Sequence, residues 1–251
     1  MSWGWILMKC WVSNDLLTAM EDEHMGENKE QARRLKELGY QRKAIAFKLY
    51  EDIPANAEPY GDDVSFHCAI AAELWEEGKK PVYITNANIL CGGAVFSGLG
   101  NRKVIKEEFD GGMEQTIGLQ RGYATRKVFR RVNQQIPHLF KHHKYQVIGA
   151  LEDVEDPDVV MIVADARKVQ RLCKAYTWET GELVHGISGT AWCNSAFPPV
   201  FRTRTMSFTM GDEQSRILMG LDDGDMYCMI HYSVLPLIIK NLDNIQTGLA
   251  T

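Results

Sequence analysis

The chain has no long hydrophobic run and no excess of basic residues, and its first residues do not have the pattern expected of a signal peptide. No apolar stretch in its 251 residues reaches the roughly 18 residues that a membrane-spanning helix needs. Its start, MSWGWILMKCWV, has neither a basic region nor a small-residue cleavage site. The formal net charge of −5 argues against a protein that coats nucleic acid. We therefore expect a cytoplasmic protein with no membrane or nucleic-acid partner.

Closely spaced cysteines and nucleotide-binding motifs are also missing. The six cysteines stand at positions 10, 68, 91, 173, 193 and 228, too far apart for a disulfide scaffold, and no CxxC pair occurs. Gly93 and Gly98 have the separation of a Walker motif, but Leu99 and Gly100 stand where lysine and serine or threonine are needed. No GxGxxG follows a strand, and no GxSxG elbow is present. These absences disfavour ATP, dinucleotides and serine-hydrolase chemistry.

Strand-like and helix-like segments interleave along the chain, which predicts an α+β fold. We expect an N-terminal extension with an amphipathic helix over residues 1–40, and a single mixed domain around one core over residues 41–251. Gly39 is expected to end the helix, which spans residues 14–38. The nearly all-apolar segment 158–164 predicts an interior strand covered on both faces. Strands are also expected over residues 44–50, 81–85 and 181–187.

Two further helices are predicted to carry cysteines. Over residues 62–77, Val64 and Cys68 fall on one apolar face, so Cys68 should point inward. Over residues 189–197, Cys193 lies in the middle of a short helix that the prolines after it should end. The ordinary interpretation of such cysteines is that they fill the core as small hydrophobic residues.

A glycine-rich stretch, NANILCGGAVFSGLGNR (residues 86–102), contains a third cysteine. Cys91 stands directly before Gly92 and Gly93, and Gly98 and Gly100 follow. Glycines permit positive φ and close approach of the backbone, so a tight loop is expected after the preceding strand. Such a loop can bring a thiol and several backbone N–H groups to one point, which suits a metal, an iron–sulfur cluster or an anion.

The one strongly basic region spans residues 115–151, where no acidic residue occurs. Its cations are Arg121, Arg126, Lys127, Arg130, Arg131, Lys141 and Lys144. The region is either a solvated helical face or a place where an anion binds. His138 and His142 have helical ligand spacing, but a proline precedes the first and no carboxylate partner is evident, so we interpret them as surface histidines.

The order of six segments resembles the domain-of-unknown-function 169 family, over about residues 41–219. The segments are AIAFKL, FHCAIAAELWEEGK, ILCGGAVFSGLG, PDVVMIVADARKVQRL, GTAWCNSAFPPV and TMSFTMGDEQSR. The resemblance implies a soluble prokaryotic protein, common in anaerobes and archaea. It implies that Cys68, Cys91 and Cys193 occupy recurrent cysteine positions and Arg216 a recurrent arginine position. The sequence departs from the family where Gly92 replaces the usual proline after the second cysteine.

Two hypotheses follow for the function. In the first, Cys68, Cys91 and Cys193 converge to hold an iron–sulfur cluster or another thiolate-bound metal, which acts in redox or Lewis-acid chemistry. Shared ligation would require sulfurs within roughly 6 to 7 Å of one another. The substrate would be an anionic small molecule bound by Gly92, Gly93, Arg126 and Arg216. In the second, the protein is a non-catalytic accessory protein that binds such an anion through the glycine loop and Arg216.

Overall fold

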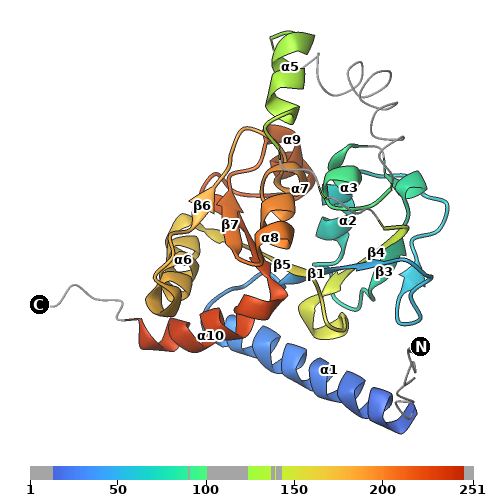
Figure 1. Ribbon diagram of the computed structural model, residues 1–251, viewed down its shortest axis with the longest axis vertical. Helices are drawn as coiled ribbons and strands as arrows, with labels where there is room; N and C mark the ends of the chain where they lie inside the picture. The colour runs from blue at the N-terminus through green and yellow to red at the C-terminus, as the bar shows by residue number, and fades with distance from the viewer. Residues whose placement is uncertain (1–13, 90, 101–123, 137–138, 140–142, 246–251) are drawn as a thin grey trace, which may run out of the picture.

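The computed structural model describes residues 14–89, 91–100, 124–136, 139 and 143–245 (Figure 1). The α-helices of that part are α1 (Asn14–Glu37), α2 (His67–Glu73), α3 (Gly93–Phe96), α5 (Arg126–Asn133), α6 (Ala166–Thr180), α7 (Trp192–Ser195), α8 (Phe197–Thr203), α9 (Glu213–Leu218) and α10 (Leu235–Asn244). The strands are β1 (Ile45–Tyr50), β2 (Glu58–Pro59), β3 (Val82–Ile84), β4 (Tyr145–Ala150), β5 (Val159–Asp165), β6 (His185–Gly186), β7 (Met206–Thr209) and β8 (Asp225–His231).

All of these strands form one mixed sheet, which makes the fold α+β as expected. The strand order is β2-β3-β4-β1-β5-β8-β7-β6. The pairs β2–β3 and β6–β7 near the two edges are parallel, and the pairs between them are antiparallel. Strand β5 lies in the middle, with Ile45 of β1 opposite Met161 and Cys228 of β8 opposite Ile162.

Strand β5 divides the apolar interior into two layers. Val159, Met161 and Val163 point into one layer, and the alternate residues Val160, Ile162 and Ala164 point into the other. All six are buried, which confirms the predicted interior strand. Burying one large side chain of this kind stabilises the fold by roughly 1.5–3 kcal/mol, which explains why both faces are covered.

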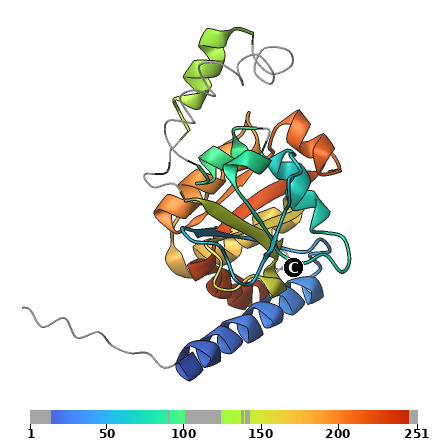
Figure 2. The same cartoon turned by 90° about the vertical axis from the view of Figure 1, so that its right-hand side faces the viewer.

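Helices cover the sheet on both sides (Figures 1 and 2). Helices α1, α6 and α10 pack on one face, while α2, α7 and α8 pack on the other. Helix α6 has the expected pattern for such a layer: Val169, Leu172 and Tyr176 are buried on its inner side. Its ends follow from local chemistry, because the Asp165 side chain accepts the Lys168 N–H at 2.9 Å and Gly181 adopts a φ of 68° after the last turn. None of the helices described is long and apolar enough to cross a membrane.

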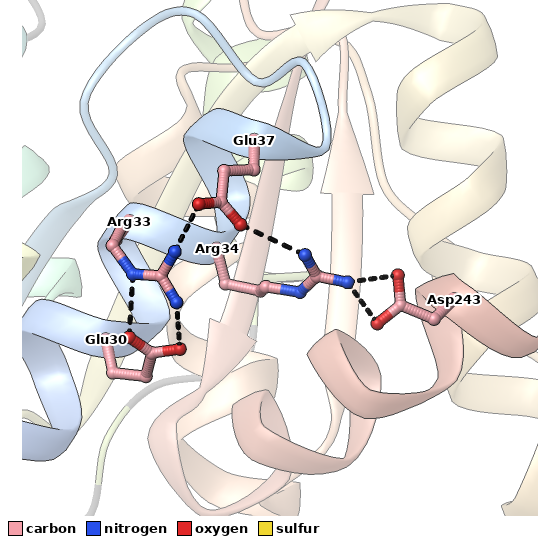
Figure 3. Close-up of polar contacts among 5 residues, drawn as sticks. All are labelled: Glu30, Arg33, Arg34, Glu37 and Asp243. Carbon is pink, nitrogen blue, oxygen red and sulfur yellow. Dashed lines mark hydrogen bonds and ion pairs between the residues drawn. The ribbon is translucent and has the colours of Figure 1, made fainter.

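Helix α1 is tied to the domain by polar and apolar contacts near its second half. Figure 3 shows Arg34 paired with both Glu37 on its own helix and Asp243 on α10. Deeper in, the buried Asn28 donates to the Val154 carbonyl at 2.7 Å and accepts from the Tyr232 hydroxyl. Leu35 joins the core layer on that face of the sheet. The division into an extension over residues 1–40 and a domain over 41–251 stays a prediction.

Three of the expected elements differ in extent. The helix expected over residues 62–77 is limited to α2, and Val64 is 49% exposed instead of lying on an apolar face. Residues before α2 are held extended because Ser65 bridges to Ile89 and its N–H donates to the Asn88 carbonyl. The strand expected over residues 181–187 is reduced to the two exposed residues of β6. Pro198 and Pro199 begin α8 instead of only ending a helix, because proline fits the first helical turn.

Candidate functional site

Three cysteines that are far apart in the sequence lie in the same layer of the core. Cys68 comes from the first turn of α2, Cys91 from the loop before α3, and Cys193 from α7. The Ser65–Ile89 bridge explains part of this convergence, because it places the Cys91 loop beside the start of α2. Cys68 and Cys193 are buried, and Cys91 is partly exposed. All five described cysteines are free thiols.

Gly93 lies between two of these sulfurs. A Cβ atom added at Gly93 would stand 2.4 Å from Cys193 Sγ and 3.3 Å from Cys91 Sγ. The two sulfurs are therefore no further apart than the sum of these distances, which falls within the range needed for shared ligation. Gly93 is helical and Gly92 has a φ of −64°, so neither needs the positive φ that was expected there. Glycine is required at position 93 because any side chain would collide with the thiols.

Burial keeps these thiols protonated. It raises the pKa of Cys68 to about 12, with a further contribution from the neighbouring Cys91, and it raises the pKa of Cys193 well above its ordinary value. Burial also raises the pKa of Cys91, but the backbone N–H groups of His67 and Gly93 oppose this by stabilising its thiolate. Cys91 is thus the thiol with the most favourable surroundings for a negative charge.

A carboxylate stands near all three thiols. The charge of Asp212 contributes to the raised pKa of Cys68, Cys91 and Cys193. Asp212 is held in place as the N-cap of α9, where it accepts the Ser215 N–H at 2.8 Å. A negative charge beside ionisable thiols favours a cation over an anion at this point.

Two aromatic side chains that sequence reasoning missed are the immediate neighbours of these cysteines. His67 precedes Cys68 and Trp192 precedes Cys193, and their ring centroids are 5.0 Å apart. Both rings are buried, and neither His67 Nδ1 nor Trp192 Nε1 has a hydrogen-bond partner in the described part of the chain. Their positions directly before the cysteines were the only feature of the sequence that could have marked His67 and Trp192 as part of the candidate site. Buried nitrogens without partners are uncommon in folded proteins.

The protonation state of His67 follows from its neighbours. Gln146 Nε2 donates to the Ser97 carbonyl at 3.3 Å, which turns Gln146 Oε1 toward His67 Nε2 at 2.7 Å. His67 Nε2 must then carry the hydrogen, and Nδ1 keeps its lone pair. Burial lowers the pKa of His67 to about 4, so the ring is neutral at physiological pH.

The donor set suits a soft metal, but the described side chains do not form a complete coordination shell. Thiolates are the natural ligands of zinc and of iron–sulfur clusters. Among the residues described, no group of three histidine, cysteine, aspartate or glutamate side chains is placed so that it could hold a metal ion. Metal binding would therefore require the thiols to move closer together.

Arg216 lies on α9 and lines a different hollow. Its Nη1 donates to the carbonyls of Met210 and Asp225 at 3.0 and 2.8 Å, and its Nη2 donates to the Asp222 carbonyl. The cavity that it lines has a volume of about 680 Å³ and also includes four acidic residues, Asp212, Glu213, Asp223 and Asp225. These surroundings disfavour an anion, and the assignment of Arg216 as an anion ligand stays a prediction.

The other predicted site residues are placed only in part. Arg126 begins α5, which stands apart from the sheet at the top of Figure 1, and its side chain lies outside the described part of the structure. His138, His142 and most of the basic region before α5 also lie outside the described residues.

Comparison with known proteins supports the resemblance seen in the sequence. Neither the curated proteins nor the solved structures gave a match. Residues 35–241 match the domain-of-unknown-function 169 family, described as uncharacterised ArCR, and this range includes all three converging cysteines and Arg216. Because the match covers most of the chain, the protein belongs to the domain-of-unknown-function 169 family.

Proposed function

We propose that this cytoplasmic protein binds a thiophilic metal ion or an iron–sulfur cluster through Cys68, Cys91 and Cys193. The bound group would serve redox or Lewis-acid chemistry on an anionic small molecule. One observation carries the proposal: Cys91 and Cys193, separated by 102 residues of sequence, come together at Gly93, and Cys68 lies in the same core layer. Core cysteines that only fill space have no reason to gather at one point.

The surroundings of the thiols support this proposal. Aromatic and aliphatic side chains of the same layer enclose Cys68 and Cys193, so water is excluded from two of the three ligands. Cys91 is partly exposed, which leaves a route from solvent. The Asp212 carboxylate favours a positive charge beside the sulfurs. Three protein ligands leave one coordination position open for a substrate.

The raised pKa values determine how binding depends on pH. A thiol must lose its proton to become a ligand, so each ligating cysteine releases a proton when a metal binds. The pKa of each of the three thiols is raised by burial, so protons compete with the metal throughout the neutral range. The affinity for Zn²⁺ should therefore rise as the pH increases from 6 to 8.

The direct test is anaerobic purification followed by metal analysis and an absorbance spectrum. The wild-type chain should contain iron with sulfide, or another thiophilic metal. A variant with Cys68→Ser, Cys91→Ser and Cys193→Ser should lose it. Cys173→Ser is the matched control, because Cys173 is on α6 on the opposite face of the sheet. Equal metal content in the triple variant and the wild type would contradict the proposal.

Reconstitution covers the case in which metal is lost during purification. Metal-free protein should bind Co²⁺ or Zn²⁺, or accept a cluster from iron and sulfide, and each cysteine variant should weaken this. Failure of the folded wild-type chain to take up any of them would also contradict the proposal. The non-catalytic alternative, an anion held by the glycine loop and Arg216, has less support because the cavity beside Arg216 is acidic.

A further inference from the structure

We propose that Cys91 and Cys193 form a reversible disulfide when the protein meets a hydroperoxide. The proposal goes beyond the proposed metal site and does not depend on it, since it needs only the two thiols.

The path between the two sulfurs is free of side-chain atoms at Gly93. A Cβ at this position would lie 2.4 Å from Cys193 Sγ, 3.4 Å from Cys193 Cβ and 3.3 Å from Cys91 Sγ. Both sulfurs thus lie close to the same point. A disulfide requires an S–S length of about 2.05 Å and Cβ atoms about 3.5–4.5 Å apart, so the sulfurs must approach further. Side-chain rotation and a small shift of the loop before α3 would achieve this.

The two thiols differ in access, which sets their order of reaction. Cys91 is partly exposed. Cys193 is buried, and its thiol lies 3.5 Å from Asn194 Oδ1, to which it donates a weak hydrogen bond. Cys91 is therefore the thiol that an oxidant reaches first, and Cys193 is the one that resolves the product.

The chemistry balances as one two-electron oxidation followed by a condensation. The Cys91 thiol loses its proton as its sulfur attacks the peroxide, an S–O bond forms, the O–O bond breaks, and an alcohol or water leaves with that proton. The Cys193 sulfur then attacks the sulfenic sulfur of Cys91. An S–S bond forms, the S–O bond breaks, and the hydroxide leaves as water with the Cys193 proton. Two thiols are oxidised and one hydroperoxide is reduced.

The test uses the full chain, reduced and freed of metal by a chelator. It is treated with one equivalent of hydrogen peroxide, alkylated and digested without reductant. Mass spectrometry should show a peptide bridged between Cys91 and Cys193, while Cys173 and Cys228 are alkylated. Dithiothreitol should reverse the bridge. A bridge through Cys68 or Cys10, a bridge between two chains, or Cys91 oxidised with no bridge would each overturn the proposal.

A variant identifies the order of reaction. Cys193→Ser should stop bridge formation and leave a sulfenic acid on Cys91 that dimedone traps, whereas Cys91→Ser should leave Cys193 unoxidised. Disulfide mapping of the oxidised wild-type chain tests the proposal even if a variant misfolds. A Cys91–Cys193 bridge without metal binding would support this inference and contradict the proposed function. Metal binding without a bridge would support the proposed function and contradict this inference.

Discussion

At the scale of single residues, Gly93 is the described glycine at which an added Cβ would come closest to another atom. We predict that Gly93→Ala destabilises the fold by about 1–3 kcal/mol, because its Cβ would meet Cys193 Sγ at 2.4 Å and force the sulfurs apart. Metal uptake should fall in the same variant. Chemical denaturation and metal titration would measure both effects.

Gly224→Ala is the matched control for this substitution, since no heavy atom outside its neighbours lies within 4 Å of the added Cβ and its φ is not positive. It should keep close to wild-type stability. A Gly93→Ala protein as stable as the control would show that the thiols can easily move away from this point.

His67 should make the stability depend on pH. Its pKa is about 4 in the folded chain and 6.5 when unfolded, so between these values only the unfolded chain binds the proton. The contribution is complete above pH 6.5 and is lost as the pH falls toward 4. The total is on the order of 3 kcal/mol.

Denaturation of wild type and His67→Gln across this range would measure that loss. The variant should show a flatter dependence of the free energy of unfolding on pH. His185→Gln, at an exposed position, should keep the wild-type dependence. An unchanged slope in His67→Gln would contradict the prediction.

The burial of Cys68 in the core could be predicted from the sequence, but the surroundings of the three cysteines could not. Cys68 could be assigned to the core from its helical spacing, and the family pattern marked all three positions. Whether His67 Nδ1 and Trp192 Nε1 find hydrogen-bond partners depends on the groups that surround them in the folded core. No local sequence pattern encodes these surroundings. The role of Gly93 was also missed, because sequence reasoning considers the φ of a glycine before the neighbours of its absent side chain.

At the scale of elements, α1 offers a comparison between buried and exposed polar contacts. Asn28→Ala should destabilise the protein by roughly 1–3 kcal/mol, because it leaves the Val154 carbonyl and the Tyr232 hydroxyl without their partner. Asp243→Asn, which removes the exposed ion pair with Arg34, should change stability very little. Thermal unfolding of the two variants would distinguish these effects. A larger loss from Asp243→Asn would show that α1 is held mainly by its surface charges.

Elements with strong periodicity or strong end signals were predicted well. Helix α1 ends close to Gly39, and β5 follows its apolar run. Helix α2 was predicted too long because residues 62–66 are compatible with a helix, yet Ser65 forms a β-bridge with Ile89 and the helix begins only at His67. Strand β6 was predicted too long because Leu183 and Ile187, apolar residues on either side of His185, are exposed.

At the scale of the whole molecule, the two apolar layers share one sheet and should unfold together. Backbone amides of β5, which pairs with strands on both sides, should exchange with solvent deuterium only through global unfolding. Amides of β6, at the sheet edge, should exchange much faster. Native-state hydrogen exchange at increasing denaturant would measure both. Fast exchange in β5 under stable conditions would indicate that the layers separate.

The position of β1 has a consequence for how the chain is made on the ribosome. Ile45 pairs with Ala150 and with Met161, so both neighbours of β1 are synthesised roughly one hundred residues later, a delay on the order of 5–20 s. A second delay of similar length separates Cys91 from Cys193. During translation β1 thus has two edges without hydrogen-bonded partner strands, and Cys68 and Cys91 are synthesised before Cys193. A nascent chain that stops before β4 cannot complete the sheet, so we expect it to depend on chaperones until its second half emerges.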